Sequence, residues 1–124
     1  MKRLISVAAA AALIAPAGAL AQTTGSSSAV TIGYVRAGTY FNGAVTSSQA
    51  VCAKHRTVTV YRNAAGADPA IGSDTTGAGG SWRLNLGGSP RPGYYYAKAK
   101  SRIAGPVGQR VLCRAAKSAV TRAS

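Results

Sequence analysis

From Ala29 onward, apolar and polar residues alternate in short runs that Gly, Pro, Asn and Ser interrupt. This two-residue period is typical of β-strands, and no stretch keeps the 3.6-residue spacing of an amphipathic helix over a useful length. The pattern predicts strands at 30–35, 40–47, 57–62, 70–76, 81–86, 94–103, 111–118 and 120–122. About seven short strands with frequent turn signals favour an all-β fold, a single small antiparallel β-sandwich.

Alternation also predicts which side chains face the core. Trp82, Leu84 and Leu86 lie two residues apart and should point to one side, away from Ser81, Arg83 and Asn85. The same argument predicts that Val58 and Val60 point inward and that Phe41 and Val45 lie on one face. The glycine-rich segment 77–80 should form the reversal before Ser81, since glycine takes positive φ without strain.

The longest predicted strand, 94–103, separates into two different faces. Its inward set should be Tyr95, Ala97, Ala99 and Ile103. The outward residues, about 7 Å apart along a strand, mix aromatic rings with cations: Tyr94, Tyr96, Lys98, Lys100 and Arg102. Such a row suits polyanions, namely acidic polysaccharides, anionic wall polymers or nucleic acid backbones. The alternative is a solvated strand face whose cations discourage edge pairing.

The N-terminus has the three parts of a secretion signal. Lys2 and Arg3 precede an apolar, alanine-rich run over 4–14, and Ala19-Leu20-Ala21 follows as a small-residue cleavage site. We therefore expect a signal peptide at 1–21 and a secreted, extracellular protein. The apolar run is shorter than the roughly 20 residues that span a bilayer, so no stable membrane insertion is expected after cleavage.

The remaining chain is strongly basic. Residues 22–124 contain thirteen Lys and Arg against two Asp, which gives a net charge of +11. A field of this sign attracts polyanions and weakens steeply with salt. Residues 22–28 (QTTGSSS) contain too few apolar groups to pack, so we expect a flexible leader there, followed by one domain at 29–122.

The two cysteines, Cys52 and Cys113, both fall in this domain. An oxidising compartment favours pairing them, and one disulfide would stabilise a domain whose core is short of large aliphatic residues. A redox pair or a metal site fits poorly, because no Cys-x-x-Cys is present and one histidine cannot complete a ligand set.

Catalytic residues are scarce. Paired-carboxylate chemistry could use only Asp68 and Asp74, which lie in or beside a turn. His55 lies between cations in Ala53-Lys54-His55-Arg56 and is expected in a surface loop, and no nucleophile-elbow sequence is present. The sequence thus predicts a non-enzymatic protein without a cofactor.

Several segments carry a family pattern: Phe41-x-Gly43-x-Val45, Val58-x-Val60, Ile71-Gly72-Ser73-Asp74-Thr75-Thr76, Gly80-Ser81-Trp82 and Pro92-Gly93-x-Tyr95-x-Ala97. Over about 39–120 the chain resembles the transthyretin-like or carboxypeptidase regulatory-like β-sandwich modules of bacterial exported proteins, with Cna-B-type relatives. Gly77 departs from the pattern, because the family usually has an acidic residue in this hairpin. The resemblance implies a seven-stranded accessory module, often non-catalytic; with no glutamate, an isopeptide crosslink has little support.

Charge, export and resemblance together predict a secreted, non-catalytic β-sandwich module that binds anionic polymers weakly at the cell surface or matrix. The alternative is a structural or accessory module that docks to another exported protein through a sheet edge. A small hydrolase or toxin is the least favoured class.

Overall fold

The computed structural model describes residues 24–124, so the predicted signal peptide at 1–21 lies outside the described residues. Within the described part the chain is all-β, with a single turn of 3-10 helix, η1 (Ala50–Cys52). The strands are β1 (Thr24–Ser26), β2 (Ser28–Val30), β3 (Gly33–Val35), β4 (Tyr40–Ser47), β5 (Thr57–Arg62), β6 (Ala70–Thr75), β7 (Ser81–Asn85), β8 (Gly93–Ala99), β9 (Arg102–Ala104), β10 (Val111–Cys113), β11 (Ala116–Lys117) and β12 (Thr121–Ala123).

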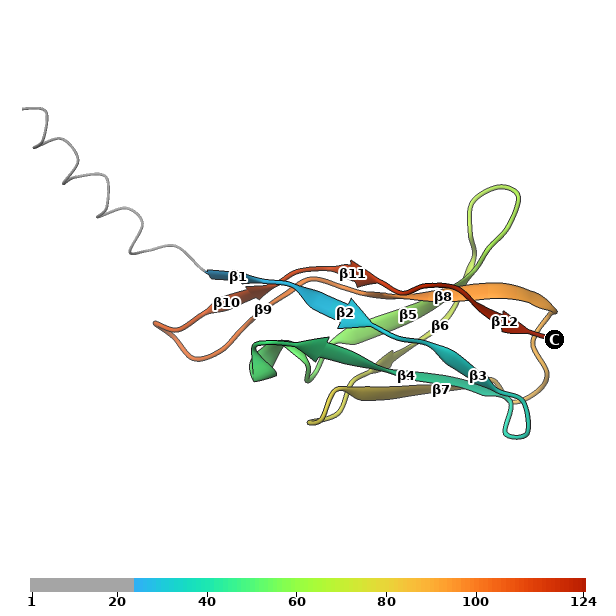
Figure 1. Cartoon of the computed structure of the whole chain (residues 1–124), viewed down its shortest axis with the longest axis horizontal. Helices are drawn as coiled ribbons and strands as arrows, with labels where there is room; N and C mark the ends of the chain where they lie inside the picture. Colours follow the sequence, from blue (N-terminus) through green and yellow to red (C-terminus); the bar gives the residue numbers. More distant parts are fainter. Residues whose placement is uncertain (1–23) are drawn as a thin grey trace, which may run out of the picture.

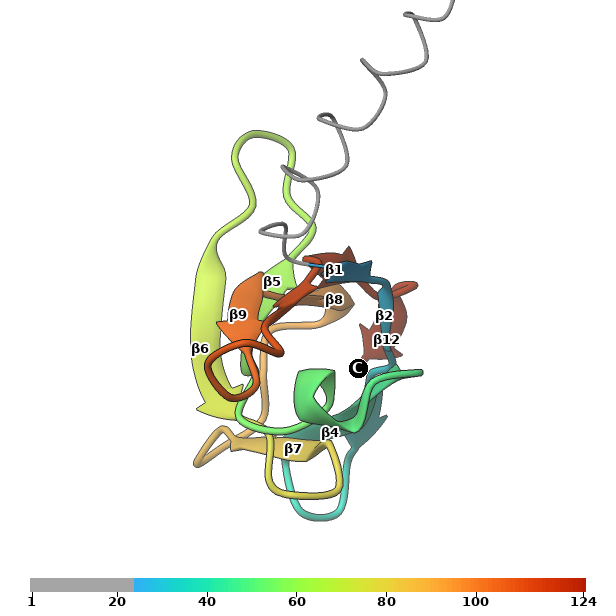
Figure 2. The same ribbon diagram turned by 90° about the vertical axis from the view of Figure 1, so that its left-hand side faces the viewer.

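Two sheets form the layers of a sandwich. One has the order β11-β8-β5-β6, with β12 also paired to β8; in the other, β2 and β3 pair with β4, which also pairs with β7. A third, three-stranded sheet, β1-β10-β9, extends from one end of the molecule (Figure 1). Viewed from that end, the strands surround the core between the two main sheets (Figure 2).

The core residues come from both layers, as the alternation predicts. Phe41, Val45 and Trp82 of one sheet meet Val58, Val60 and Tyr95 of the other, and all are buried. Leu84 and Leu86 are half-buried against this cluster. The predicted all-β sandwich is therefore confirmed, including the inward faces of its central strands.

The strands β4 to β7 begin and end within one residue of the predicted ranges. Their limits are set by local turn chemistry, which a sequence shows directly. Gly80 closes the predicted reversal with φ of +90°, and its N–H donates to the Gly77 carbonyl at 3.0 Å. A Cβ there would lie 2.4 Å from the Val45 carbonyl oxygen, so only glycine fits.

Three predicted strands are each divided in two. The range 30–35 contains β3 and the last residue of β2, 94–103 spans most of β8 and β9, and 111–118 holds β10 and β11. The two parts of the second and third ranges pair in different sheets, so the chain leaves one ladder before it joins the next. Side-chain alternation does not reveal these breaks, because it carries no information about the pairing partner.

The expectation of a flexible leader at 22–28 is wrong for the residues that the structure describes. β1 pairs with β10 in parallel, with Thr24 opposite Val111 and Ser26 opposite Cys113, while β2 pairs with β4. Ser26 is buried, and its carbonyl accepts a hydrogen bond from the Arg114 N–H at 3.0 Å. Backbone hydrogen bonds order this segment without apolar side chains, and they add a parallel pair to an otherwise antiparallel sandwich.

The predicted disulfide is present. Cys52 and Cys113 are joined with a Cα–Cα distance of 5.2 Å, and both are buried with Ala104 in a small second cluster. The bond connects η1, which follows β4 of the main sandwich, to β10 of the end sheet. It therefore fixes the third sheet to the sandwich.

Not every basic residue adds to the positive charge of the surface, because the side chain of Arg56 is 0% exposed. The guanidinium donates five hydrogen bonds: two to the Lys100 carbonyl, and one each to Ser28 Oγ and the carbonyls of Cys52 and Arg114. Burial, with a smaller contribution from the charge of Arg102, lowers the pKa of Arg56. Arg56 thus joins the sandwich to the end sheet through backbone acceptors.

Candidate polyanion-binding face

The side chains of β8 point to alternate sides of the sheet, as predicted. Tyr95, Ala97 and Ala99 are buried, whereas Tyr94 is 48% exposed and Lys98 is exposed. Tyr94 and Lys98 are thus accessible members of the predicted outward row.

Tyr96 points to the same outer side, but it is only 4% exposed, which corrects the expectation of an open stacking surface. Three groups cover its ring. Tyr61 stacks on it with centroids 5.4 Å apart, Lys117 Nζ lies 4.4 Å from its centroid, and its hydroxyl donates to Asp68 Oδ2 at 2.6 Å. Tyr96 therefore holds the outer face together instead of offering a free ring.

Lys100 and Arg102 do not continue the row. β8 ends at Ala99, Lys100 is exposed beyond it, and Arg102 begins β9 with its Nη1 donating to the Lys54 carbonyl at 3.0 Å. Ile103, predicted to face inward, is 55% exposed, while Ala104 is buried. The residues between β8 and β9 shift the alternation by one, so the predicted row ends at Lys98.

Neighbouring strands supply the remaining members of the face. Tyr61 of β5 lies opposite Tyr96, Lys117 of β11 opposite Lys98, and Arg122 of β12 opposite Tyr94. We define the basic-aromatic face by these six residues, which all lie on the outer side of one sheet: Tyr61, Tyr94, Tyr96, Lys98, Lys117 and Arg122.

Each cation of the basic-aromatic face lies near a tyrosine ring. Besides the Lys117–Tyr96 contact, Lys98 Nζ lies 5.3 Å from the Tyr61 centroid and Arg122 Cζ lies 5.8 Å from the Tyr94 centroid. Such contacts are worth about 0.5–1 kcal/mol at exposed sites. All three cationic side chains remain exposed, so the rings orient them without withdrawing them from solvent.

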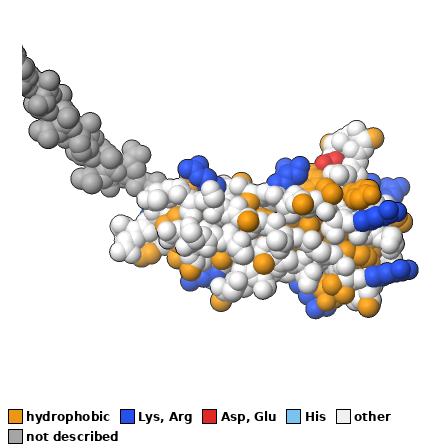
Figure 3. Space-filling model, viewed as in Figure 1, with side chains coloured by type: hydrophobic (Ala, Val, Ile, Leu, Met, Phe, Trp, Pro, Cys, Tyr) orange, Lys and Arg blue, Asp and Glu red, His pale blue; other side chains and the backbone are white. Residues whose placement is uncertain are grey.

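Asp68, from the loop between β5 and β6, is the carboxylate beside this face. Hydrogen bonds from the Tyr96 hydroxyl and then from the Ala64 N–H lower the pKa of Asp68, and the charges of Lys117 and Lys98 act in the same direction. The same bond raises the pKa of Tyr96 to about 12. In Figure 3 the acidic atoms lie at the base of the projecting loop, with basic side chains near them.

The sequence contained a signal for one missing member of the face. Tyr61 follows Thr57 and Thr59 at the outward spacing of β5, so alternation alone could have placed it. Lys117 and Arg122 required knowledge of the pairing, because β11 and β12 are two and three residues long and both pair with β8.

The residues considered for catalysis lie apart from this face or are already engaged. His55 is exposed with φ of +55°, and Asp74 accepts a hydrogen bond from the Arg83 N–H at 2.8 Å. Between residues 24 and 124, no group of three His, Cys, Asp or Glu side chains could hold a metal ion. No helix within residues 24–124 is long and apolar enough to cross a membrane.

The chain matches no protein-family model and shows no significant similarity to a curated protein.

Proposed function

We propose that this protein is a secreted, non-catalytic β-sandwich module that binds anionic polymers weakly at the cell surface or in the matrix, through the basic-aromatic face. The observation that carries the proposal is the grouping of three exposed cations, Lys98, Lys117 and Arg122, on adjacent strands of one sheet. The resemblance to transthyretin-like modules of exported proteins is consistent with a non-catalytic role.

The spacing of these cations favours a repeating anion over a single small one. Lys98 and Lys117 occupy paired positions on strands about 4.8 Å apart, while Arg122 lies opposite Tyr94, four residues back along β8. The half-exposed Tyr94 ring adds a surface on which a sugar or base can stack. Asp68 interferes little, because its carboxylate already accepts bonds from Tyr96 and Ala64.

Heparin-affinity chromatography over a salt gradient tests the proposal. The face variant Lys98→Gln/Lys117→Gln/Arg122→Gln should elute at clearly lower salt than the wild type. Each lost contact should also flatten the dependence of affinity on salt, because fewer counterions are released. The matched control is a set of three exposed arginines outside the face, Arg36→Gln/Arg83→Gln/Arg110→Gln, which removes the same charge.

The control variant should elute near the wild type. Equal losses in the two triple variants would instead assign retention to net charge alone and refute a specific face. Retention that does not respond to ionic strength would contradict an electrostatic mechanism altogether. Anionic wall polymer and DNA, run in parallel, identify which backbone the face prefers.

One observation favours the accessory function as a second candidate. In the described part of the chain β9 pairs only with β10, so it presents a free edge. Ile103 in β9 is 55% exposed, and Val107 in the loop that follows is 86% exposed. An exported partner docking at this edge should be lost from co-purification in Ile103→Asp, with heparin retention unchanged. Loss of heparin retention in that variant would speak against separate sites.

A further inference from the structure

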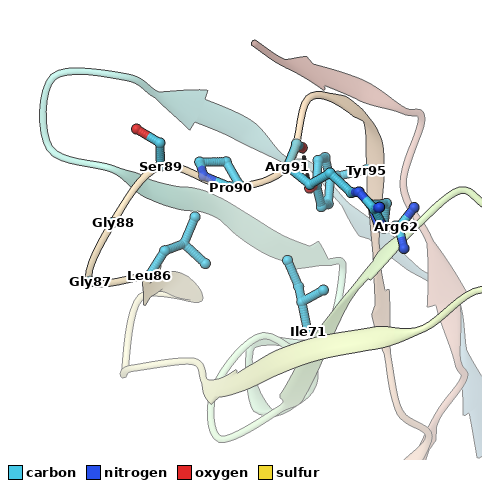
Figure 4. A pocket seen from close by; sticks show the side chains of 9 residues that line it. All are labelled: Arg62, Ile71, Leu86, Gly87, Gly88, Ser89, Pro90, Arg91 and Tyr95. Atoms are coloured by element: carbon cyan, nitrogen blue, oxygen red, sulfur yellow. Dashed lines mark hydrogen bonds between the residues drawn. The ribbon is translucent and has the colours of Figure 1, made fainter.

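A pocket of about 300 Å³ opens at the edge of the sandwich core, beneath the loop that joins β7 to β8. Its wall combines three apolar side chains with two arginines and a tyrosine: Ile71, Leu86, Pro90, Arg62, Arg91 and Tyr95. Figure 4 shows these side chains converging from the loop, from β6 and from the ends of β5 and β8.

Both arginines lie beside Tyr95 in the wall of this pocket. Arg62 ends β5 opposite Tyr95, which places it on the inward side of its sheet, and the Tyr95 hydroxyl donates to the Arg91 carbonyl at 2.5 Å. Burial raises the pKa of Tyr95, whereas the charges of Arg62 and Arg91 both act to lower it. In Figure 4 the Arg91 side chain runs past the Tyr95 ring towards Arg62.

Neither aspartate side chain neutralises this pair. Asp68 is engaged by Tyr96 and Ala64, and Asp74 by the Arg83 N–H. Two neighbouring guanidinium groups repel each other, and the repulsion is stronger where protein displaces water. An anion between them would relieve that repulsion, and a planar carboxylate fits the donor geometry of arginine.

The rest of the wall is suited to an apolar group. Ile71 and Leu86 are half-buried and pack against the main core cluster, and Pro90 is half-buried on the loop side. The pocket volume lies at the lower end of the range of about 300–1,000 Å³ that is typical of small-molecule sites. The pocket therefore combines an apolar floor with a cationic rim at one side.

We propose that this pocket binds a small organic monocarboxylate, with the carboxylate between Arg62 and Arg91 and a short aliphatic body against Ile71, Leu86 and Pro90. This inference goes beyond the polymer-binding function, because the ligand is a small molecule. The site also lies on the inward side of the sheet, whereas the basic-aromatic face lies on the outer side.

Titration with sodium hexanoate, followed by amide chemical shifts in ¹H–¹⁵N NMR spectra, tests the proposal on the folded wild-type protein. We expect saturable shifts concentrated at Gly87, Gly88 and Tyr95. The neutral analogue hexanamide should bind at least about tenfold more weakly, since hydrogen bonds to charged groups contribute about 1.5–3 kcal/mol. This ligand comparison needs no variant and so does not depend on the folding of one.

Arg62→Gln/Arg91→Gln should weaken hexanoate binding by about tenfold or more, because it removes the same hydrogen bonds to a charged group. Arg36→Gln/Arg110→Gln, which removes two exposed arginines elsewhere, should leave it unchanged. If the double variant does not fold, Arg91→Gln alone, in the exposed loop, should still weaken binding several-fold.

Equal affinity for hexanoate and hexanamide, an equal effect of the control pair, or the absence of saturable shifts at millimolar hexanoate would each overturn the proposal. The polymer-binding proposal and the pocket proposal can be refuted independently of each other. A pocket that does not bind hexanoate leaves heparin retention untouched, and a face variant that loses heparin retention should still bind hexanoate.

Discussion

The buried guanidinium of Arg56 gives the strongest prediction about stability. Its five hydrogen bonds end on Ser28, Cys52, Lys100 and Arg114, which belong to segments far apart in the sequence. Arg56→Met keeps an unbranched apolar side chain in the same space but removes every donor. Three backbone carbonyls would then lose a partner in the interior.

The expected cost follows from two opposing terms. Hydrogen bonds to a charged group contribute about 1.5–3 kcal/mol each in net terms and are not additive. Removing the cation also removes its desolvation penalty, which is several kcal/mol for a buried ion. The three buried carbonyls left without a partner cost about 1–3 kcal/mol each. The relieved desolvation offsets part of that cost, so we expect Arg56→Met to lower the free energy of unfolding by about 4 kcal/mol.

A loss of that size is a large fraction of the 5–15 kcal/mol, roughly, that stabilises a typical domain. It should lower Tm by about 20 °C for a domain of this length. Urea unfolding followed by tryptophan fluorescence measures the change directly, because Trp82 is the one tryptophan and is buried. The disulfide must remain intact during the measurement, so that both proteins have the same covalent constraint.

Two variants serve as controls. Arg56→Lys keeps the charge but concentrates its donors on one atom, so it cannot reach all four acceptors. It should therefore be nearly as destabilising as Arg56→Met. Arg102→Met removes a single hydrogen bond, to the Lys54 carbonyl, and should cost only about 1 kcal/mol. An Arg56→Met protein within about 1 kcal/mol of the wild type would refute the reasoning, because the bonds would then do no more than offset desolvation.

Two further predictions concern the disulfide and the phenol–carboxylate bond. The cysteines are separated by 61 positions in the sequence, for which chain-entropy arithmetic gives the Cys52–Cys113 bond about 4 kcal/mol. Cys52→Ala/Cys113→Ala should therefore unfold at much lower urea, and an unchanged midpoint would contradict this. Because the pKa of Tyr96 is raised to about 12, its bond to Asp68 should stabilise the fold fully below the ordinary tyrosine pKa and be lost as pH rises through 12. Ultraviolet titration of tyrosinate should show one late-ionising tyrosine that Asp68→Asn moves to lower pH, and no such movement would count against the bond.

The candidate face illustrates how far alternation reaches. It correctly assigned Tyr94, Lys98 and the inward residues of β8, because a strand turns successive side chains to opposite sides whatever its neighbours are. It failed at Arg102 and Ile103, where the ladder ends and the phase shifts by one residue. It could not foresee that Tyr96 is covered, because the covering groups come from a loop and from two other strands.

What the sequence determined by itself is local. Period-two patterning and glycine turn chemistry act over a few residues, and they fixed the all-β class, the limits of β4 to β7 and the inward set around Val58 and Val60. The pairing of the two cysteines also followed, because two cysteines allow a single intramolecular bond.

Only the tertiary structure decided the features that depend on pairing between distant segments. The polar residues 24–28 are ordered by backbone hydrogen bonds to β10 and β4, and a side-chain pattern carries no signal for such bonds. Arginine is usually a surface residue, yet Arg56 is buried because four acceptors, three of them distant in the sequence, converge on its guanidinium. Lys117 and Arg122 join the basic-aromatic face for the same physical reason, since strand pairing, and not sequence distance, sets which side chains are neighbours.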